Sequence, residues 1–136
     1  MTVGTLSDED RFEVVKYRLE KSQRAYHEAV GSIDSGFVET AANRLYYAVS
    51  ALLIAHGISA RTHNGVIQMF GLNFIKPKLI DRKYGAIFNQ LFSLRLTGDY
   101  EDRRNLDLQT DVIPLVDPAK ELIDKVSELA KQAVGL

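Results

Sequence analysis

Apolar residues recur at three- and four-residue steps along almost the whole chain, which is the period of an α-helix. Near the N-terminus, the residues on this period are Phe12, Val15, Leu19, Tyr26, Ala29 and Ile33. A half-buried strand would instead alternate apolar and polar residues, and no segment shows that alternation. The sequence therefore predicts an all-α protein.

Capping and helix-breaking residues divide this pattern into five helices. The expected helices span residues 7–32, 37–56, 63–73, 81–96 and 117 to the C-terminus. Ser7 and Thr62 are expected N-caps, and Asp117 followed by Pro118 is typical of a helix start. Residues 97–116 are expected to be irregular. Because helices joined by short loops pack as neighbours, we predict a single domain over residues 1–136, an up-and-down antiparallel bundle of about five helices.

The composition excludes several classes of protein. The 136 residues carry a net charge of -1, so any contact with RNA needs a local basic patch rather than a globally basic chain. The absence of cysteine excludes disulfides and thiolate nucleophiles. No two histidines lie at helical i, i+3 or i+4 spacing, so we predict no metal site and no cofactor.

The N-terminus MTVGTLSDED lacks the basic start and apolar run of a signal peptide. No apolar run approaches the roughly 18 residues of a membrane span. These features predict a cytoplasmic protein with no membrane partner.

The first of three polar clusters lies in the expected second helix. Helical spacing places Asn43, Tyr47 and Ser50 on one face, with Arg44 beside them and Tyr46 closer to the apolar stripe. Such residues can bind a nucleotide or RNA. They can equally extend their polar ends over the edge of an ordinary bundle.

The second cluster, RTHNG, places Arg61 and His63 at a helix N-terminus. Backbone N–H groups and the helix dipole can hold an anion such as phosphate there. A plain loop and cap would look the same. His63 is the most plausible histidine for chemistry, since His27 and His56 have no ionisable partner evident from spacing.

The third cluster is LFSLRLTGDY, which contains Arg95, Asp99 and Tyr100. Arg95 and Asp99 can form an ion pair if the helix extends that far. An exposed pair of this kind contributes only about 0.3–0.5 kcal/mol to stability. Spacing alone leaves open whether these residues form such a pair or an active site.

The residues of the three clusters lie in three stretches, which are AANRLYYAVSALLIAHGI, RTHNGVIQMFGLNFIK and LRLTGDY. In this order they resemble the HEPN superfamily (higher eukaryotes and prokaryotes nucleotide-binding). The resemblance covers about residues 10–130. The chain looks most like the small stand-alone prokaryotic HEPN proteins. These typically show an Arg-x-Tyr-Tyr-Ala helix, a Lys/Arg-x-His-x-Gly helix start and an Arg-x-x-Ala-Asp-Tyr helix end. The matching residues are Arg44, Tyr46, Tyr47, Ala48, Arg61, His63, Gly65, Arg95, Asp99 and Tyr100.

The resemblance implies an all-α bundle that usually forms a homodimer. Many family members are metal-independent endoribonucleases with an Arg-x(4–6)-His motif from both subunits across a cleft. Many are toxins encoded beside a minimal nucleotidyltransferase antitoxin, which in some systems adenylylates a tyrosine near that motif. By this comparison Arg95, Asp99, Tyr100 and His63 are candidate catalytic residues. The candidate nucleotide- or RNA-binding residues are Asn43, Arg44, Tyr47, Arg61 and His63.

The chain departs from this family pattern because no histidine follows Arg95. Metal-free RNA cleavage needs a base for the 2′-OH proton and an acid for the leaving oxygen. Arg95 could stabilise the charge of the phosphorane. Tyr100 is a poor base at neutral pH, because an unperturbed tyrosine titrates near ~10. His63 can substitute only if the fold brings it next to Arg95.

Three functions therefore remain open, and whether the chain is an enzyme remains open with them. The first is a HEPN protein with an RNA- or nucleotide-related role, non-catalytic or partnered with a minimal nucleotidyltransferase whose target is Tyr100. The second is a metal-independent endoribonuclease toxin of a toxin–antitoxin pair. The third is a structural helical dimer. The missing histidine favours the first over the second.

Overall fold

The computed structural model describes residues 7–56, 62–100 and 106–135, and every element in these ranges is helical. The all-α prediction is therefore confirmed for the described part of the chain. The helices are α1 (Asp8–Asp34), α2 (Val38–Ala55), α3 (His63–Phe70), α4 (Arg82–Tyr100) and α5 (Ile113–Val134), with π-helical turns η1 (Gly71–Ile75) and η2 (Leu108–Val112).

The first three helices begin where the sequence predicts. The Ser7 side chain caps α1 by accepting from the Asp10 amide at 3.1 Å, and the Thr62 side chain caps α3 by accepting from Gly65 at 3.0 Å. Gly36, with a φ of +77°, allows the tight turn between α1 and α2. The helical path of α3 continues through η1 to Ile75, two residues beyond the predicted end at residue 73.

The prediction that residues 97–116 are irregular is wrong in two places. Helix α4 continues to Tyr100, because an isolated glycine such as Gly98 costs a helix only about 1 kcal/mol. Helical structure also resumes at Leu108. There the Asp107 side chain accepts from the Thr110 amide at 2.9 Å, and the Asp111 side chain accepts from the Asp107 amide at 2.8 Å. This reciprocal cap starts the last helical segment, so Pro118 lies inside α5.

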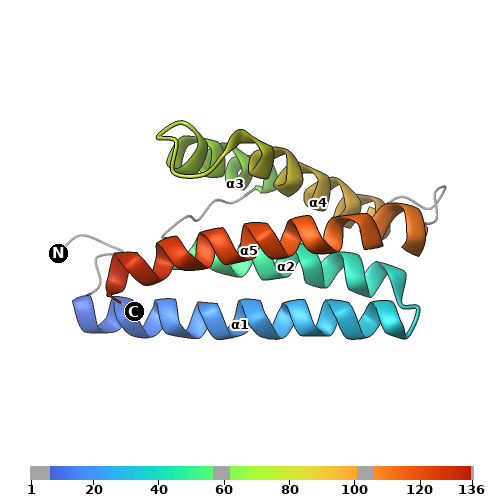
Figure 1. Ribbon diagram of the computed structural model, residues 1–136, viewed down its shortest axis with the longest axis horizontal. Helices are drawn as coiled ribbons and strands as arrows, with labels where there is room; N and C mark the ends of the chain where they lie inside the picture. Colours follow the sequence, from blue (N-terminus) through green and yellow to red (C-terminus); the bar gives the residue numbers. More distant parts are fainter. Residues whose placement is uncertain (1–6, 57–61, 101–105, 136) are drawn as a thin grey trace.

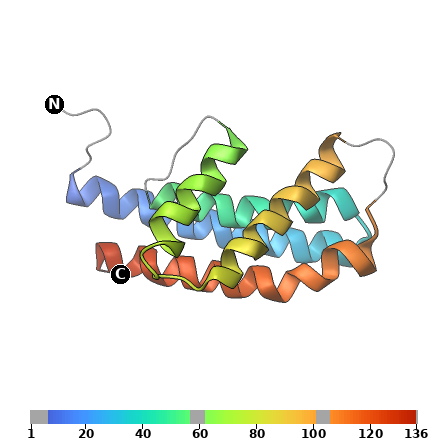
Figure 2. The same cartoon turned by 90° about the horizontal axis from the view of Figure 1, so that it is seen from above.

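Helices α1, α2 and α5 lie side by side, and α3 and α4 cross one face of this layer as a hairpin (Figures 1 and 2). Helix α1 runs antiparallel to both α2 and α5, which run in the same direction (Figure 1). Helix α2 contacts α1, α4 and α5, so it is the central helix of the bundle.

The core is a continuous set of apolar side chains from all the helices, with a cluster of stacked rings at its centre. Phe88 of α4 is fully buried, and its ring lies 5.8 Å from Tyr46 of α2 and 5.1 Å from Phe70 of α3. The α1–α2 interface is built from small residues instead, and the buried Ser22 hydroxyl donates to the Ala48 carbonyl at 2.6 Å. No helix in the described ranges is long and apolar enough to cross a membrane.

His56, at the end of α2, has a partner that spacing could not reveal. Its Nε2 lies 3.1 Å from the Val126 carbonyl oxygen of α5, and its ring packs edge-on against Phe74. Because a carbonyl only accepts, Nε2 carries the proton and donates. Burial lowers the pKa of His56 below its usual 6.5, and nearby Arg11 lowers this pKa further, although the bond to Val126 opposes the change.

We expect the protein to lose stability in mild acid through His56. Because the pKa of His56 is lowered in the folded protein, the unfolded chain binds a proton at His56 more readily. The free energy of unfolding therefore keeps its full value above about pH 6.5 and decreases as the pH falls below that value. Urea unfolding from about pH 7.5 to about pH 5.5 should show a smaller loss for His56→Gln than for the wild type. His27→Gln, at an exposed position of α1, is the control. Parallel losses in the wild type and His56→Gln would contradict this prediction.

Candidate functional site

Arg95 is held against a buried aromatic ring between α2 and α4. Its guanidinium carbon lies 5.2 Å from the centroid of the Tyr46 ring. Tyr46 is only 6% exposed, confirming that it belongs to the core, and it stacks on Phe88 and packs against Phe92. The partly buried Arg95 guanidinium therefore packs on the Tyr46 ring, whose position is fixed by the close packing of the core.

The extension of α4 changes the expected relation of Arg95, Asp99 and Tyr100. Because the helix runs to Tyr100, Arg95 and Asp99 lie one turn apart on the same face. Tyr100 lies about 100° further around the helix. The side chains of residues 96–100 lie outside the described part of the structure, so the predicted Arg95–Asp99 ion pair stays a prediction.

The polar cluster on α2 is brought together largely as predicted. The Arg44 guanidinium donates to the Asn43 side-chain oxygen at 3.0 Å and lies 5.0 Å from the Tyr47 ring centroid. Ser50 instead donates to the Tyr46 carbonyl of its own helix at 3.0 Å, which is an ordinary helical interaction. Asn43, Arg44 and Tyr47 therefore form one unit.

Two residues of α1 that lie beside this unit, Tyr17 and Lys21, were not singled out by sequence analysis. The Lys21 ammonium lies 5.9 Å from the Tyr47 ring centroid and 5.6 Å from that of Tyr17. A hydrogen bond and charge interaction with the Tyr17 side chain, followed by the same effects of Tyr47, raise the pKa of Lys21 above its usual value. The spacing of Tyr17 and Lys21, one helical turn apart, could have indicated their own contact. It could not have indicated the contact with Tyr47 on another helix.

The neighbouring tyrosines of α2 point to different helices. Tyr46 contacts Phe88, Phe92 and Arg95 of α4, whereas Tyr47 contacts Lys21 of α1. Successive helical residues differ in direction by about 100°, which explains this division. The two cation–aromatic groups thus lie on different sides of α2, one toward α4 and the other toward α1.

The predicted helix start at His63 is confirmed, but the structure does not test its chemistry. Arg61 and the side chain of His63 lie outside the described residues. The first turn of α3 and the last turn of α4 both lie along the upper edge of Figure 2, on the same side of the bundle. An approach of His63 to Arg95 stays a prediction.

A hollow of 590 Å³ between α4 and the start of α5 differs in chemistry from both cation–aromatic groups. Its lining includes Asn89, Ser93, Asp111 and Pro114. None of the residues described around it is lysine or arginine. It therefore lacks the cation that a phosphate ligand would need.

Relatives of the chain include proteins with toxin names. A "UPF0332 protein" of Thermotoga maritima is 27% identical over 88% of this chain and 93% of its own length. Two proteins of Methanocaldococcus jannaschii, both named "Putative toxin", are 31% and 30% identical. The matched regions cover 61% and 65% of this chain, and they cover 59% and 68% of the two proteins' own lengths.

The HEPN domain family matches residues 15–130, which include nearly all of the bundle and both cation–aromatic groups. This match agrees with the resemblance carried by the α2, α3 and α4 motifs. The chain belongs to the HEPN domain family.

Proposed function

We propose that this chain is a toxin-like HEPN protein that acts on RNA, with Arg95 as its phosphate-binding residue. The observation that carries the proposal is the placement of the Arg95 guanidinium over the buried Tyr46 ring at 5.2 Å. Relatives named as toxins support the toxin-like part of the proposal.

The chemistry of arginine fits this role. A guanidinium remains charged at all physiological pH values and presents a planar edge of N–H donors that matches two phosphate oxygens. The Tyr46 ring lies 5.2 Å from the guanidinium carbon as a cation–π partner, and this contact leaves the positive charge of Arg95 intact. Binding of RNA needs no general base, so the absence of a histidine after Arg95 does not affect this step.

Replacing Arg95 with alanine should weaken RNA binding by about ten- to a hundredfold, since a hydrogen bond to a charged group contributes about 1.5–3 kcal/mol. Arg95→Lys should lie between Arg95→Ala and the wild type, because lysine keeps the charge but not the two-pronged geometry. Fluorescence anisotropy with a labelled single-stranded RNA measures these affinities.

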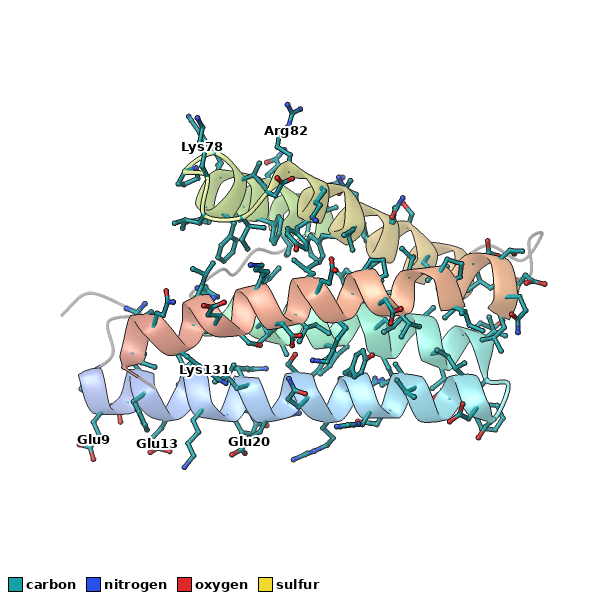
Figure 3. The ribbon with its side chains drawn as sticks, in the orientation of Figure 1. Glu9, Glu13, Glu20, Lys78, Arg82 and Lys131 are labelled. Atoms are coloured by element: carbon teal, nitrogen blue, oxygen red, sulfur yellow. The ribbon has the colours of Figure 1, made fainter. Side chains whose placement is uncertain are left out.

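Arg82→Ala is a matched control for the loss of one arginine from α4. Arg82 is exposed and points away from the bundle (Figure 3). Circular dichroism checks that each variant is folded. A folded Arg95→Ala protein that binds RNA as tightly as the Arg82→Ala protein would contradict the role of Arg95.

A second candidate function is metal-independent RNA cleavage. It is favoured by the continuation of α4 to Tyr100, which places Asp99 on the same face as Arg95. The base would come from His63, Tyr100 would protonate the leaving 5′-oxygen, and Arg95 would stabilise the charge of the phosphorane. The same variants serve here: if purified wild type cleaves RNA, Arg95→Ala and His63→Ala should both reduce cleavage. Unchanged cleavage in both would exclude this mechanism.

Two partners belong to the same proposal. One is a second copy of the chain, and the other is a minimal nucleotidyltransferase whose target is Tyr100. Light scattering at micromolar concentration distinguishes a dimer from a monomer. A chain that neither binds RNA nor arrests growth on expression, yet dimerises, would instead be the structural helical dimer.

A further inference from the structure

We propose that α1 and α2 together form a binding track for single-stranded RNA, in addition to the Arg95 site. The track consists of Tyr17, Arg18 and Lys21 of α1 and Arg44 and Tyr47 of α2. This inference rests on the proposed function, because it assumes that the chain binds RNA. It adds that the bound RNA is single-stranded and that this RNA also lies on a second surface, the track.

The centre of the track is a lysine between two aromatic rings. Lys21 lies 5.6 Å from the Tyr17 ring centroid and 5.9 Å from the Tyr47 ring centroid. Arg18 lies 5.5 Å from the Tyr17 centroid. Tyr17 remains 50% exposed, which leaves area on its ring for a base to stack.

Arg44 extends the track along α2. Its guanidinium lies 5.0 Å from the Tyr47 centroid, and its bond to Asn43 fixes its direction. Arg44 also lines a hollow of 590 Å³ at the turn between α1 and α2. The lining of this hollow includes Glu28, Ser32, Ser35, Thr40 and the exposed ring of Phe37. A strand crossing Tyr17 and the half-buried Tyr47 would thus meet a further ring at Phe37, which is 62% exposed.

Three acidic residues of α1 lie on a different side of the helix from Lys21. Glu9, Glu13 and Glu20 point outward on the side of α1 away from the other helices (Figure 3). Lys21 follows Glu20 directly and is therefore turned about 100° from it, toward α2. Lys21 of α1 and Arg44 of α2 therefore meet at the Tyr47 ring, where the two helices adjoin. A chain with a net charge of -1 thereby acquires the local basic patch that RNA binding requires.

The simplest alternative is an ordinary solvated helix surface, because long cations often lie over aromatic rings. Such pairs occur elsewhere in this protein, as in Lys83 over Tyr84 and Lys120 over Tyr26. Each of these joins one cation to one ring. The track differs because three cations and two rings from two helices are in contact. Alternating cations and stackable rings are what single-stranded nucleic acid recognises.

The test compares RNA affinities of purified full-length variants, using a labelled single-stranded RNA of about ten nucleotides. The Lys21→Gln/Arg44→Gln double variant should bind about tenfold more weakly. The slope of log affinity against log salt should become less steep, by about 0.7 for each phosphate that the variant no longer neutralises. Tyr17→Leu should also bind several-fold more weakly, whereas Tyr17→Phe should match the wild type because it keeps the ring.

Lys83→Gln is the matched control, since it removes a cation beside a tyrosine on α4. The track is overturned if Tyr17→Leu and the double variant bind like Lys83→Gln, or if duplex RNA of the same length competes as well as single-stranded RNA. Loss of binding in Arg95→Ala alone overturns the track and leaves the proposed function standing. Loss in the track variants alone supports the track and overturns the role of Arg95.

Discussion

Replacing Phe88 with alanine is expected to destabilise the protein by about 3–5 kcal/mol. Phe88 has no exposed surface and lies between the rings of Tyr46 and Phe70. Removing it deletes a large apolar side chain and leaves a cavity among rings that cannot all relax into it. Since this stack joins α4 to α2, the variant should also loosen the support of Arg95. Urea unfolding followed by circular dichroism measures the change.

Phe37→Ala is the matched control, because it makes the same chemical change where the ring is 62% exposed. Its free energy of unfolding should stay within about 0.5 kcal/mol of the wild type. Similar losses in Phe88→Ala and Phe37→Ala would mean that the aromatic stack is not the centre of the core.

Enlarging Ala29 to leucine is expected to destabilise the protein by about 1–3 kcal/mol. Ala29 is fully buried and lies seven residues, or two turns, beyond Ser22 on the same face of α1. The bond of 2.6 Å from the Ser22 hydroxyl to the Ala48 carbonyl shows how closely α1 and α2 approach there. A larger side chain has to push the two helices apart.

Ala86→Leu tests whether this loss comes from packing, because Ala86 is exposed on α4. Leucine is nearly as favourable as alanine within a helix, so stability should hardly change. Thermal unfolding of both variants should therefore show a lower Tm for Ala29→Leu only. An unchanged Tm for Ala29→Leu would argue against close packing of α1 on α2.

The described helices follow from the periodic apolar residues and from caps that act locally. Ser7 and Thr62 mark their helix starts because each side chain accepts a bond from an amide three residues ahead. The last helix shows the limit of this reasoning. Asp117 and Pro118 match a helix start, but Asp107 makes the actual cap, and burial of Val112 holds the earlier turn in the core. Tertiary packing thus decided between two acceptable local signals.

The contacts of the candidate site also differ in whether the sequence could predict them. Contact of Arg44 with Tyr47 follows from their three-residue separation within one helix. Contact of Lys21 with Tyr47 depends on how far α1 is displaced along α2, and the position of Arg95 over Tyr46 depends on how α4 crosses α2. Neither offset is encoded in local spacing, so sequence analysis identified Arg95 only through family resemblance and missed Lys21.

The most direct test of RNA binding at the Arg95 site and at the track is ultraviolet crosslinking. The full-length protein is crosslinked to single-stranded RNA containing thiouridine, and the crosslinked peptides are identified by mass spectrometry. The account predicts crosslinks in the α1 peptide that contains Tyr17, the α2 peptide that contains Tyr47 and the α4 peptide that contains Arg95. Crosslinks confined to other surfaces, such as the exposed connector around Lys78, would contradict it, as would the absence of crosslinks at RNA concentrations that saturate binding.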